Sequence, residues 1–438
     1  MAQNDIYNSK ERYEKIVQRI DSLAEKPWQR SLSKFQSNKT GIGKAKYYCK
    51  NIKNLEYFKK LFPYFDSKDI SYVRRIRLFN TLKLISFATE KDFKNCNRED
   101  INGIVAFMHT VYPSSKSKRD FITDLKHMWK ILLPEVDVQG RIDDTLFPYQ
   151  VRHLNAKQDK SKEKMRDDKL TIEEYESLIK SFSMDVRLQA FLSLAFESLG
   201  RPQEILFTKI KDVELHDNYA KVYISEHGKE GTGFLEVIDS FPYLSAWYNQ
   251  HPLKQNPNAY LFINIGDFGK YGQLNPHTIN KHLREKLHMV GIKKKITCYS
   301  LKRNGVTFRR LRGDSDLQIQ HAARWTSTKQ LKTYDLSIHD ESFKIELAKR
   351  GIIQDAKYKE FQTLTKKCIF CEKVNGIGDD ICKNCKRPLD REKIVKEQES
   401  KEKELQDFKK NLEVWKNNLR KELMVEAVEI MKREVIQK

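Results

Sequence analysis

The sequence lacks any run of about 18 uncharged apolar residues, the minimum that a membrane-spanning helix requires. Its first residues, MAQNDIYNSKERYEK, contain no apolar segment like the one at the centre of a secretory signal peptide. The cysteines number seven, and an odd total argues against a framework of disulfides. These absences argue against a membrane protein and a disulfide-rich secreted protein, and they predict a cytoplasmic location.

What the chain has in excess is positive charge. Its 438 residues include 82 Lys and Arg against 60 Asp and Glu, which gives a formal net charge of +22. A chain with this charge repels itself unless a polyanion shares its surface, so we expect nucleic acid as the partner. Charge alone leaves a membrane surface open as an alternative and names no function.

The length exceeds what one hydrophobic core supports, so two or three domains are expected. Residues 1–54 are polar and basic and predict an N-terminal arm or a small helical extension. Apolar residues recur every three and four positions over 55–155, which predicts a helical domain. Residues 156–168 hold almost no apolar side chain and predict a linker, after which a second domain covers 169–352.

The second domain combines helical and strand patterns. Thr171 and Glu174 form a capping-box pattern at the start of a helix. Residues 220–224 and 233–238 then alternate like two strands around a glycine-rich turn, and helical patterns resume to about residue 351. The fold class predicted for this domain is therefore α+β, mainly α with a small antiparallel β-sheet.

A cysteine-rich module follows at residues 364–390. The segment CIFCEKVNGIGDDICKNC is Cys-x2-Cys-x10-Cys-x2-Cys, and its cysteines are Cys368, Cys371, Cys382 and Cys385. Two such knuckles can surround one zinc ion with four thiolates and leave no open position, so we predict a structural zinc ribbon whose folding depends on the metal. An iron–sulfur site or a redox dithiol pair stays open as an alternative.

The last segment, residues 391–438, is highly charged and predicts an amphipathic helix. Its apolar residues keep the 3,4 spacing of a coiled-coil seam at Leu405, Phe408, Leu412, Trp415 and Leu419. A single helix that docks onto its own domain is an equally good interpretation.

Residues 169–352 carry ordered boxes that resemble the catalytic domain of tyrosine recombinases, the phage-type integrases, and especially the archaeal branch. FESLGRPQEILFTKIKDV has Gly-Arg at a helix end with Glu three residues later, and HGKEG has a lysine in a glycine-rich strand turn. ARWTSTKQLKTYDLS has Trp and then Tyr nine residues later. The resemblance implies that residues 55–155 are the core DNA-binding domain. Similar ribbons follow the catalytic domain in some archaeal integrases.

The resemblance also implies the site residues. The catalytic set is the nucleophile Tyr334 with Arg201, Lys229, Tyr299, Lys302 and Trp325, and the supporting residues are Glu204 and Arg303. One box, YSLKRNGVTFRRLRG, departs from the family pattern. Tyr299 stands where His is usual, and Lys302 stands where the second Arg is usual, with Arg303 one position further on.

The chemistry of phosphodiester cleavage explains these residue types. Attack on the phosphorus builds negative charge on the non-bridging oxygens, which Arg201 and Lys302 would stabilise. Tyr334 would form a phosphotyrosyl link at the 3′ side, and Lys229 would protonate the departing 5′ oxygen. Because bond energy is conserved in the link, no ATP is expected. The resemblance also implies that catalysis uses no metal or other cofactor.

The resemblance thus predicts a site-specific DNA recombinase that integrates or excises a mobile element, associated with the nucleoid. On double-stranded DNA we expect a homo-tetramer that exchanges strands through a Holliday junction. In free solution, without DNA, the prediction also allows a monomer. Two other functions stay open. One is a type IB topoisomerase-like nicking and closing enzyme, and the other is a catalytically silent DNA-binding protein that kept the fold.

Overall fold

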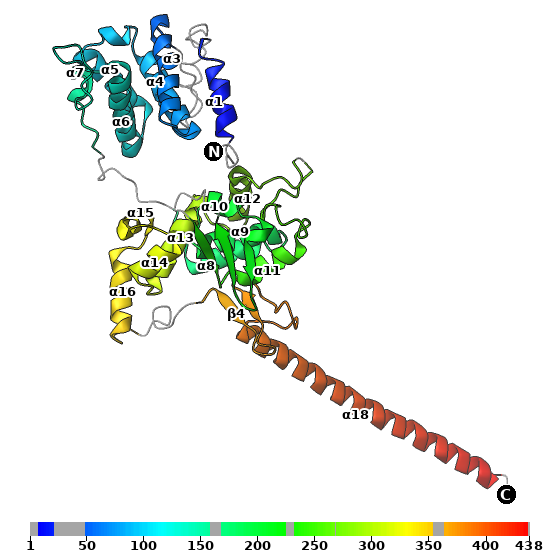
Figure 1. The fold of residues 1–438 in the computed structure, drawn as a ribbon. Coiled ribbons are helices and arrows are strands. Elements are labelled where there is room, and N and C mark those ends of the chain that lie inside the picture. Colours follow the sequence, from blue (N-terminus) through cyan, green and yellow to red (C-terminus); the bar gives the residue numbers. More distant parts are fainter. Residues whose placement is uncertain are drawn as a thin grey trace. The chain divides into compact units, whose positions relative to one another are not determined.

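The computed structural model describes residues 8–21, 49–157, 168–224, 232–267, 269–353 and 363–436. The chain divides into two compact units, Met1–Arg166 and Asp167–Lys438 (Figure 1). Within the described ranges, no helix combines the length and the apolar character needed to cross a membrane.

The first unit is helical. Its helices are α1 (Ser9–Val17), α3 (Leu55–Ser67), α4 (Tyr72–Ala88), α5 (Arg98–Val111), α6 (Ser115–Leu132) and α7 (Tyr149–Arg152), with short 3-10 turns at Ile52–Asn54 and Phe93–Asn95. Phe58, Phe79 and Trp129 are fully buried in one core. Within the segment predicted as an arm, Tyr13 stacks on Phe79 with 5.7 Å between ring centroids, so α1 packs into this same core.

Part of the basic surface of α4 is neutralised inside the unit. Arg74 and Arg77 both pair with the buried carboxylate of Asp124, at 2.8 and 2.7 Å. Arg75 pairs with Asp66 at 2.7 Å. These three arginines therefore hold α4 against α6 and the end of α3, in addition to any contact that their exposed parts make with a ligand.

The second unit is mainly α with a small antiparallel sheet, as predicted. Its elements up to residue 350 are α8 (Ile172–Ser181), α9 (Val186–Glu197), α10 (Pro202–Leu206), the 3-10 turn Ile210–Asp212, β1 (Val213–Leu215), β2 (Ala220–Ile224), β3 (Gly233–Val237), α11 (Phe241–Gln250), α12 (Pro276–Met289), α13 (Cys298–Leu311), α14 (Asp316–Ala322), η7 (Thr328–Gln330), α15 (Leu331–Tyr334) and α16 (His339–Lys349). The strand order is β1-β2-β3, with Ala220 opposite Val237.

Helix α9 is the centre of this unit, because every residue from Arg187 to Glu197 is buried. Helix α13 crosses it closely at Gly305, where an added Cβ would lie 1.9 Å from the carbonyl oxygen of Phe196. Glu197, at the end of α9, accepts hydrogen bonds from the backbone N–H groups of Ile238 and Ser240 at 2.8 and 2.7 Å. Burial raises the pKa of the Glu197 carboxyl, and its hydrogen bonds fix the exit of β3.

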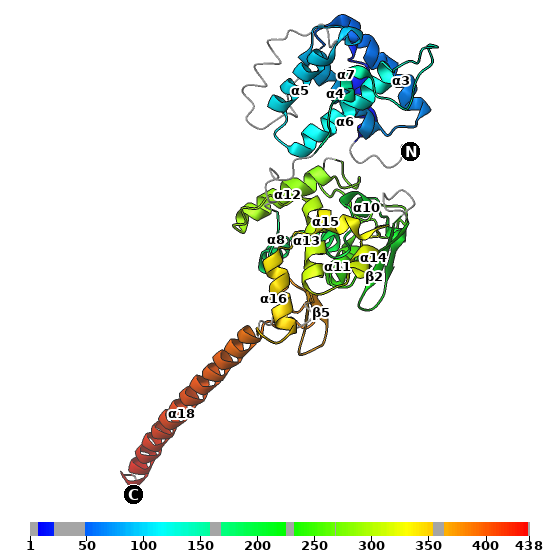
Figure 2. The same cartoon turned by 90° about the vertical axis from the view of Figure 1, so that its left-hand side faces the viewer.

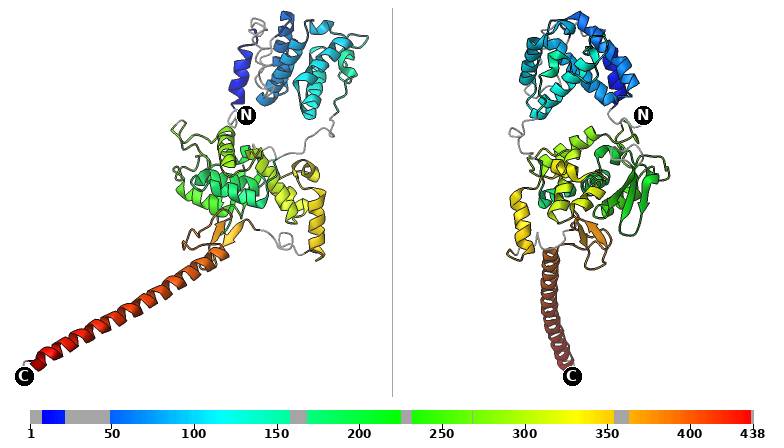
Figure 3. Two further views of the ribbon diagram at one scale, coloured as in Figure 1. Left: turned by 180° about the vertical axis from the view of Figure 1, so that it is seen from behind. Right: turned by 60° about the vertical axis from the view of Figure 1, so that its left-hand side comes forward.

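The unit ends in a two-stranded module and one long helix. Strands β4 (Thr365–Lys367) and β5 (Val374–Gly376) pair antiparallel. Helix α18 (Arg391–Ile436) then runs without interruption for 46 residues (Figure 3).

Candidate active site

The turn between α9 and α10 presents Arg201. Leu199 adopts a left-handed conformation with φ of 54° although it is not glycine, and its side chain is fully buried. Arg201 follows as the N-cap of α10, and its backbone N–H donates to Glu204 Oε2 at 2.8 Å. The guanidinium Nη1 also lies 3.4 Å from Glu204 Oε1, so the carboxylate fixes both the turn and the side chain.

Glu204 also binds a second arginine that the sequence analysis did not assign to the site. Arg324 Nη2 donates to Glu204 Oε2 at 2.7 Å, and the side chains of both residues are under 10% exposed. Arg324 has φ of 55° and directly precedes Trp325. The buried Glu204 carboxylate therefore holds two guanidinium groups, and the three side chains together carry a net positive charge.

Lys302, Trp325 and Tyr334 meet in one cluster. Lys302 Nζ lies 5.4 Å from the ring centroid of Trp325 and 5.4 Å from that of Tyr334. The two rings are 5.1 Å apart between centroids. The Lys302 residue is only 1% exposed, so its ammonium is close to both aromatic faces in a water-poor place, where a cation–π contact is strongest.

Apolar packing holds this cluster together, and Figure 2 shows its helices α13, α14 and α15. Trp325 belongs to a small core with Leu199, Val306, Ile319, Ala322, Ala323 and Leu331, against which Tyr334 packs. Because Leu199 is next but one to Arg201, the same core joins the arginine turn to the tyrosine helix. Within the described ranges, the buried indole N–H of Trp325 meets no hydrogen-bond acceptor.

The variant box, YSLKRNGVTFRRLRG, also contains Tyr299 and Arg303. Tyr299 is the second residue of α13 and is 37% exposed. Arg303 Nη2 pairs with Asp168 and contacts Ser300 Oγ at 3.2 Å, so Arg303 links α13 to the start of the unit. Lys229 lies outside the described residues. Arg303 and Lys302 are neighbours in the sequence, but consecutive residues of a helix project about 100° apart. Arg303 therefore pairs with Asp168, whereas Lys302 lies against Trp325 and Tyr334.

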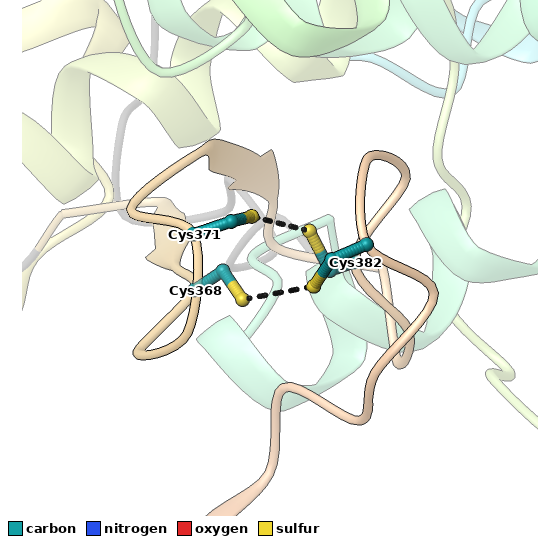
Figure 4. A group of neighbouring side chains, drawn as sticks. Cys368, Cys371 and Cys382 are labelled. Carbon is teal, nitrogen blue, oxygen red and sulfur yellow. Dashed lines mark hydrogen bonds between the residues drawn. The ribbon is translucent and has the colours of Figure 1, made fainter.

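The four cysteines converge on one point (Figure 4). Their Sγ atoms all lie within 4.8 Å of one another, with Cys368 to Cys385 at 3.5 Å and Cys371 to Cys382 at 3.6 Å. A tetrahedral zinc ion with bonds of about 2.3 Å requires sulfur–sulfur distances of about 3.8 Å, so the donor set fits a structural metal. Hydrogen bonds from the backbone N–H of Lys373 and from the side chain of Asn384 lower the pKa of the Cys371 thiol to about 6.

The cysteine module packs against helices α8 and α11. The backbone N–H of Gly378 donates to the Tyr243 hydroxyl at 2.8 Å, and Lys366 Nζ lies 2.6 Å from Glu176 of α8. Gly376 lies so close to Tyr243 that an added Cβ would be 2.1 Å from the ring carbon Cζ. Tyr243 is fully enclosed by these contacts, and burial raises the pKa of its hydroxyl well above the usual range.

One family model matches the domain that contains these residues. Residues 168–351 match the phage integrase family. This stretch includes Arg201, Glu204, Lys302, Trp325 and Tyr334. No curated protein sequence matches the chain.

Solved structures agree on the fold. XerH site-specific recombinase bound to a palindromic difH substrate, in a post-cleavage complex, has a TM-score of 0.53 at 14% identity and covers 68% of this chain and 86% of its own. A lambda integrase dimer bound to a COC′ core site has a TM-score of 0.50 at 15% identity, with coverage of 64% and 94%. The Tn1549 transposon integrase in complex with transposon right end DNA has a TM-score of 0.50 at 12% identity, with coverage of 67% and 99%. The part of the chain that these structures cover, about two thirds of it, therefore has the fold of these recombinases.

Proposed function

We propose that the chain is a tyrosine recombinase whose nucleophile is Tyr334. The observation that carries the proposal is the convergence of Lys302, Trp325 and Tyr334, with the ammonium 5.4 Å from both ring centroids. A tyrosine beside a cation and an arginine turn is the arrangement that covalent attack on a phosphodiester needs. The phage integrase match over 168–351 supports the same assignment.

The proposed reaction exchanges one ester for another. The phenolic oxygen of Tyr334 attacks the phosphorus, the bond from phosphorus to the 5′ oxygen breaks, and a 3′-phosphotyrosyl link forms. The phenolic proton passes to water, and Lys229 donates a proton to the departing 5′ oxygen. A 5′ hydroxyl from a second strand then reverses the reaction. Because the ester is conserved, the cycle needs no ATP. In this proposal protein cations, and no catalytic metal, stabilise the phosphate charge.

Arg201 and Lys302 stabilise the charge that develops on the non-bridging oxygens. Glu204 orients Arg201 and is itself balanced by Arg324, so that two cations share one anion beside the phosphate site. The indole N–H of Trp325, which has no acceptor in the described part of the chain, supplies a further donor for a phosphate oxygen. Tyr299 is more exposed than Lys302 and Trp325, and it contacts the phosphate from the protein surface.

The proposed biological setting follows from the family. Four copies assemble on two sites of double-stranded DNA and exchange strands through a Holliday junction, which integrates or excises a mobile element. The protein is of the archaeal integrase type. The net charge of +22 supports phosphate binding, which is the sequence-independent part of DNA affinity. The cysteine module binds a structural zinc, and the protein works with the nucleoid.

The test is formation of a covalent adduct on nicked suicide DNA that carries candidate sites. Wild-type protein should give a protein–DNA band that survives denaturant, and Tyr334→Phe should give none. Tyr219→Phe, a change of an exposed tyrosine in the turn after β1, is the matched control and should keep the adduct. Absence of an adduct with wild type, despite tight binding to the same DNA, would contradict the proposal.

One observation favours a second candidate, a catalytically silent DNA-binding protein. Lys302 replaces the usual Arg and is 1% exposed beneath two rings, which restricts its access to a phosphate. This candidate predicts binding without an adduct. A topoisomerase-like enzyme would instead form the adduct and relax supercoiled DNA without a paired site, so a relaxation assay separates the two enzyme types.

A further inference from the structure

Helix α18 leaves the cysteine module through a small apolar contact. Ile394 is 8% exposed, and it lines a pocket of about 570 Å³ together with Phe370 and Ile369 of the first knuckle. Beyond this point, the described side chains from Glu399 to Ile430 are exposed. The helix is therefore fixed to the module at its first turns and is solvated over the rest of its described length.

The solvated part carries a continuous apolar line, which we call the α18 stripe. Its residues follow one another at intervals of three and four, and their exposed fractions are Leu405 54%, Phe408 65%, Leu412 39%, Trp415 59%, Leu419 39% and Leu423 56%. Intervals of three and four place these side chains on one face of an α-helix. The stripe is thus a helix face with no covering element in the described structure.

The size of the stripe fits pairing with an identical helix. If about 100 Å² of each of the twelve side chains in two stripes leaves water, roughly 1,200 Å² is buried, which is the lower end of a specific protein interface. A 3,4 seam is also its own complement, because each side chain fits a gap between side chains of an identical helix. A second copy of this chain always offers that partner.

Charge favours the same occupant. Helix α18 contains twelve Lys and Arg residues and eleven Asp and Glu residues, whereas the whole chain carries +22. Two nearly neutral helices approach without the repulsion that the rest of the chain would cause, and such a helix has little attraction for DNA phosphates. Because the α18 stripe is apolar and the helix is nearly neutral, DNA is not the preferred partner of this face.

We propose that the α18 stripe pairs with the α18 stripe of a second copy and makes the protein a dimer in the absence of DNA. The pairing is independent of the chemistry at Tyr334 and holds for a recombinase and for a silent DNA-binding protein alike. As a consequence, two subunits bind DNA already joined through their α18 helices. Each α18 is attached to its own subunit through the cysteine module.

Sedimentation equilibrium of the zinc-loaded full chain without DNA tests the proposal. Wild type should show twice the chain mass of 51.9 kDa at micromolar concentration. The double variant Leu412→Asp/Leu419→Asp should raise the dimer Kd by at least about 100-fold, because four buried leucines are replaced by charges in each dimer. The matched control Gln406→Asp/Asn417→Asp places the same charges on the opposite face and should leave the Kd unchanged.

Folding of the rest of the chain is checked in the same samples. The thermal transition of the 167–438 unit should be the same in wild type and in both double variants, because the stripe has no packing partner among the described residues. A wild-type monomer at concentrations well above micromolar would overturn the proposal. So would a dimer that survives in Leu412→Asp/Leu419→Asp, because the interface would then lie elsewhere.

Discussion

Removal of the Glu204 carboxylate should strongly destabilise the catalytic unit. Glu204→Ala deletes the acceptor of the Arg201 backbone N–H at 2.8 Å and of Arg324 Nη2 at 2.7 Å. The Arg324 side chain is 8% exposed, so its charge would remain in a water-poor place without the Glu204 carboxylate. Loss of one partner of a buried ion pair costs about 3–5 kcal/mol, and loss of the helix cap adds about 1 kcal/mol.

The total of about 4–6 kcal/mol is a large part of the roughly 5–15 kcal/mol by which a domain is stable. Glu204→Gln should cost less, because the amide oxygen still accepts one hydrogen bond. Combining Glu204→Ala with Arg324→Met removes the stranded cation, and the double variant should recover about 2 kcal/mol relative to the sum of the single changes.

Urea-induced unfolding of the zinc-loaded full chain, followed by circular dichroism and fluorescence, measures these differences. Glu413→Ala on the exposed face of α18 is the control, and its unfolding free energy should stay within about 0.5 kcal/mol of wild type. If Glu204→Ala is as stable as that control, or if the double variant is additive, the carboxylate does not hold the two arginines as described.

Four further outcomes are expected. Lys302→Met should slow adduct formation by about 10²–10³-fold and leave stability equal or higher, because it removes a transition-state cation and a buried ammonium. Chelation of the bound metal should lower the Tm of the 167–438 unit by more than about 4 °C, because the cysteine module packs on α11. Gly376→Ala should destabilise the unit by about 1–3 kcal/mol in urea unfolding, because its methyl would overlap Tyr243. Burial lowers the pKa of His251 below 6.5, and His251 Nδ1 accepts from the backbone N–H of Leu253 at 3.1 Å. The folded state therefore binds this proton less readily than the unfolded chain, and the unfolding free energy should fall below pH 6.5 by up to about 1.4 kcal/mol per pH unit more in wild type than in His251→Gln.

Local patterns were predictable from the sequence. The strands expected at 220–224 and 233–238 are β2, with the same bounds, and β3, which ends one residue earlier. The capping box of Thr171 and Glu174 is formed, with hydrogen bonds of 2.8 and 3.2 Å. Both features depend on side-chain alternation or on contacts between residues three positions apart, and such signals lie within one short segment.

Long-range contacts were not predictable in the same way. Arg324 joins the site because it reaches Glu204, a residue 120 positions earlier, and no spacing rule connects the two. The strand β1 was also missed, since Val213–Leu215 is only three residues long and gains its hydrogen bonds from β2. The charged pattern of 391–438 predicted a helix but left its partner open, and the structure shows its apolar side chains exposed.

The contacts of the cysteine module bring the two ends of the catalytic unit together. Lys366 of β4 meets Glu176 of α8, the first helix of the unit, and Gly378 meets Tyr243 of α11. The chain between them is therefore a closed loop that contains the arginine turn and the tyrosine helix, and neither end can fray without opening the module first. A loop closed in this way has no structurally privileged starting point.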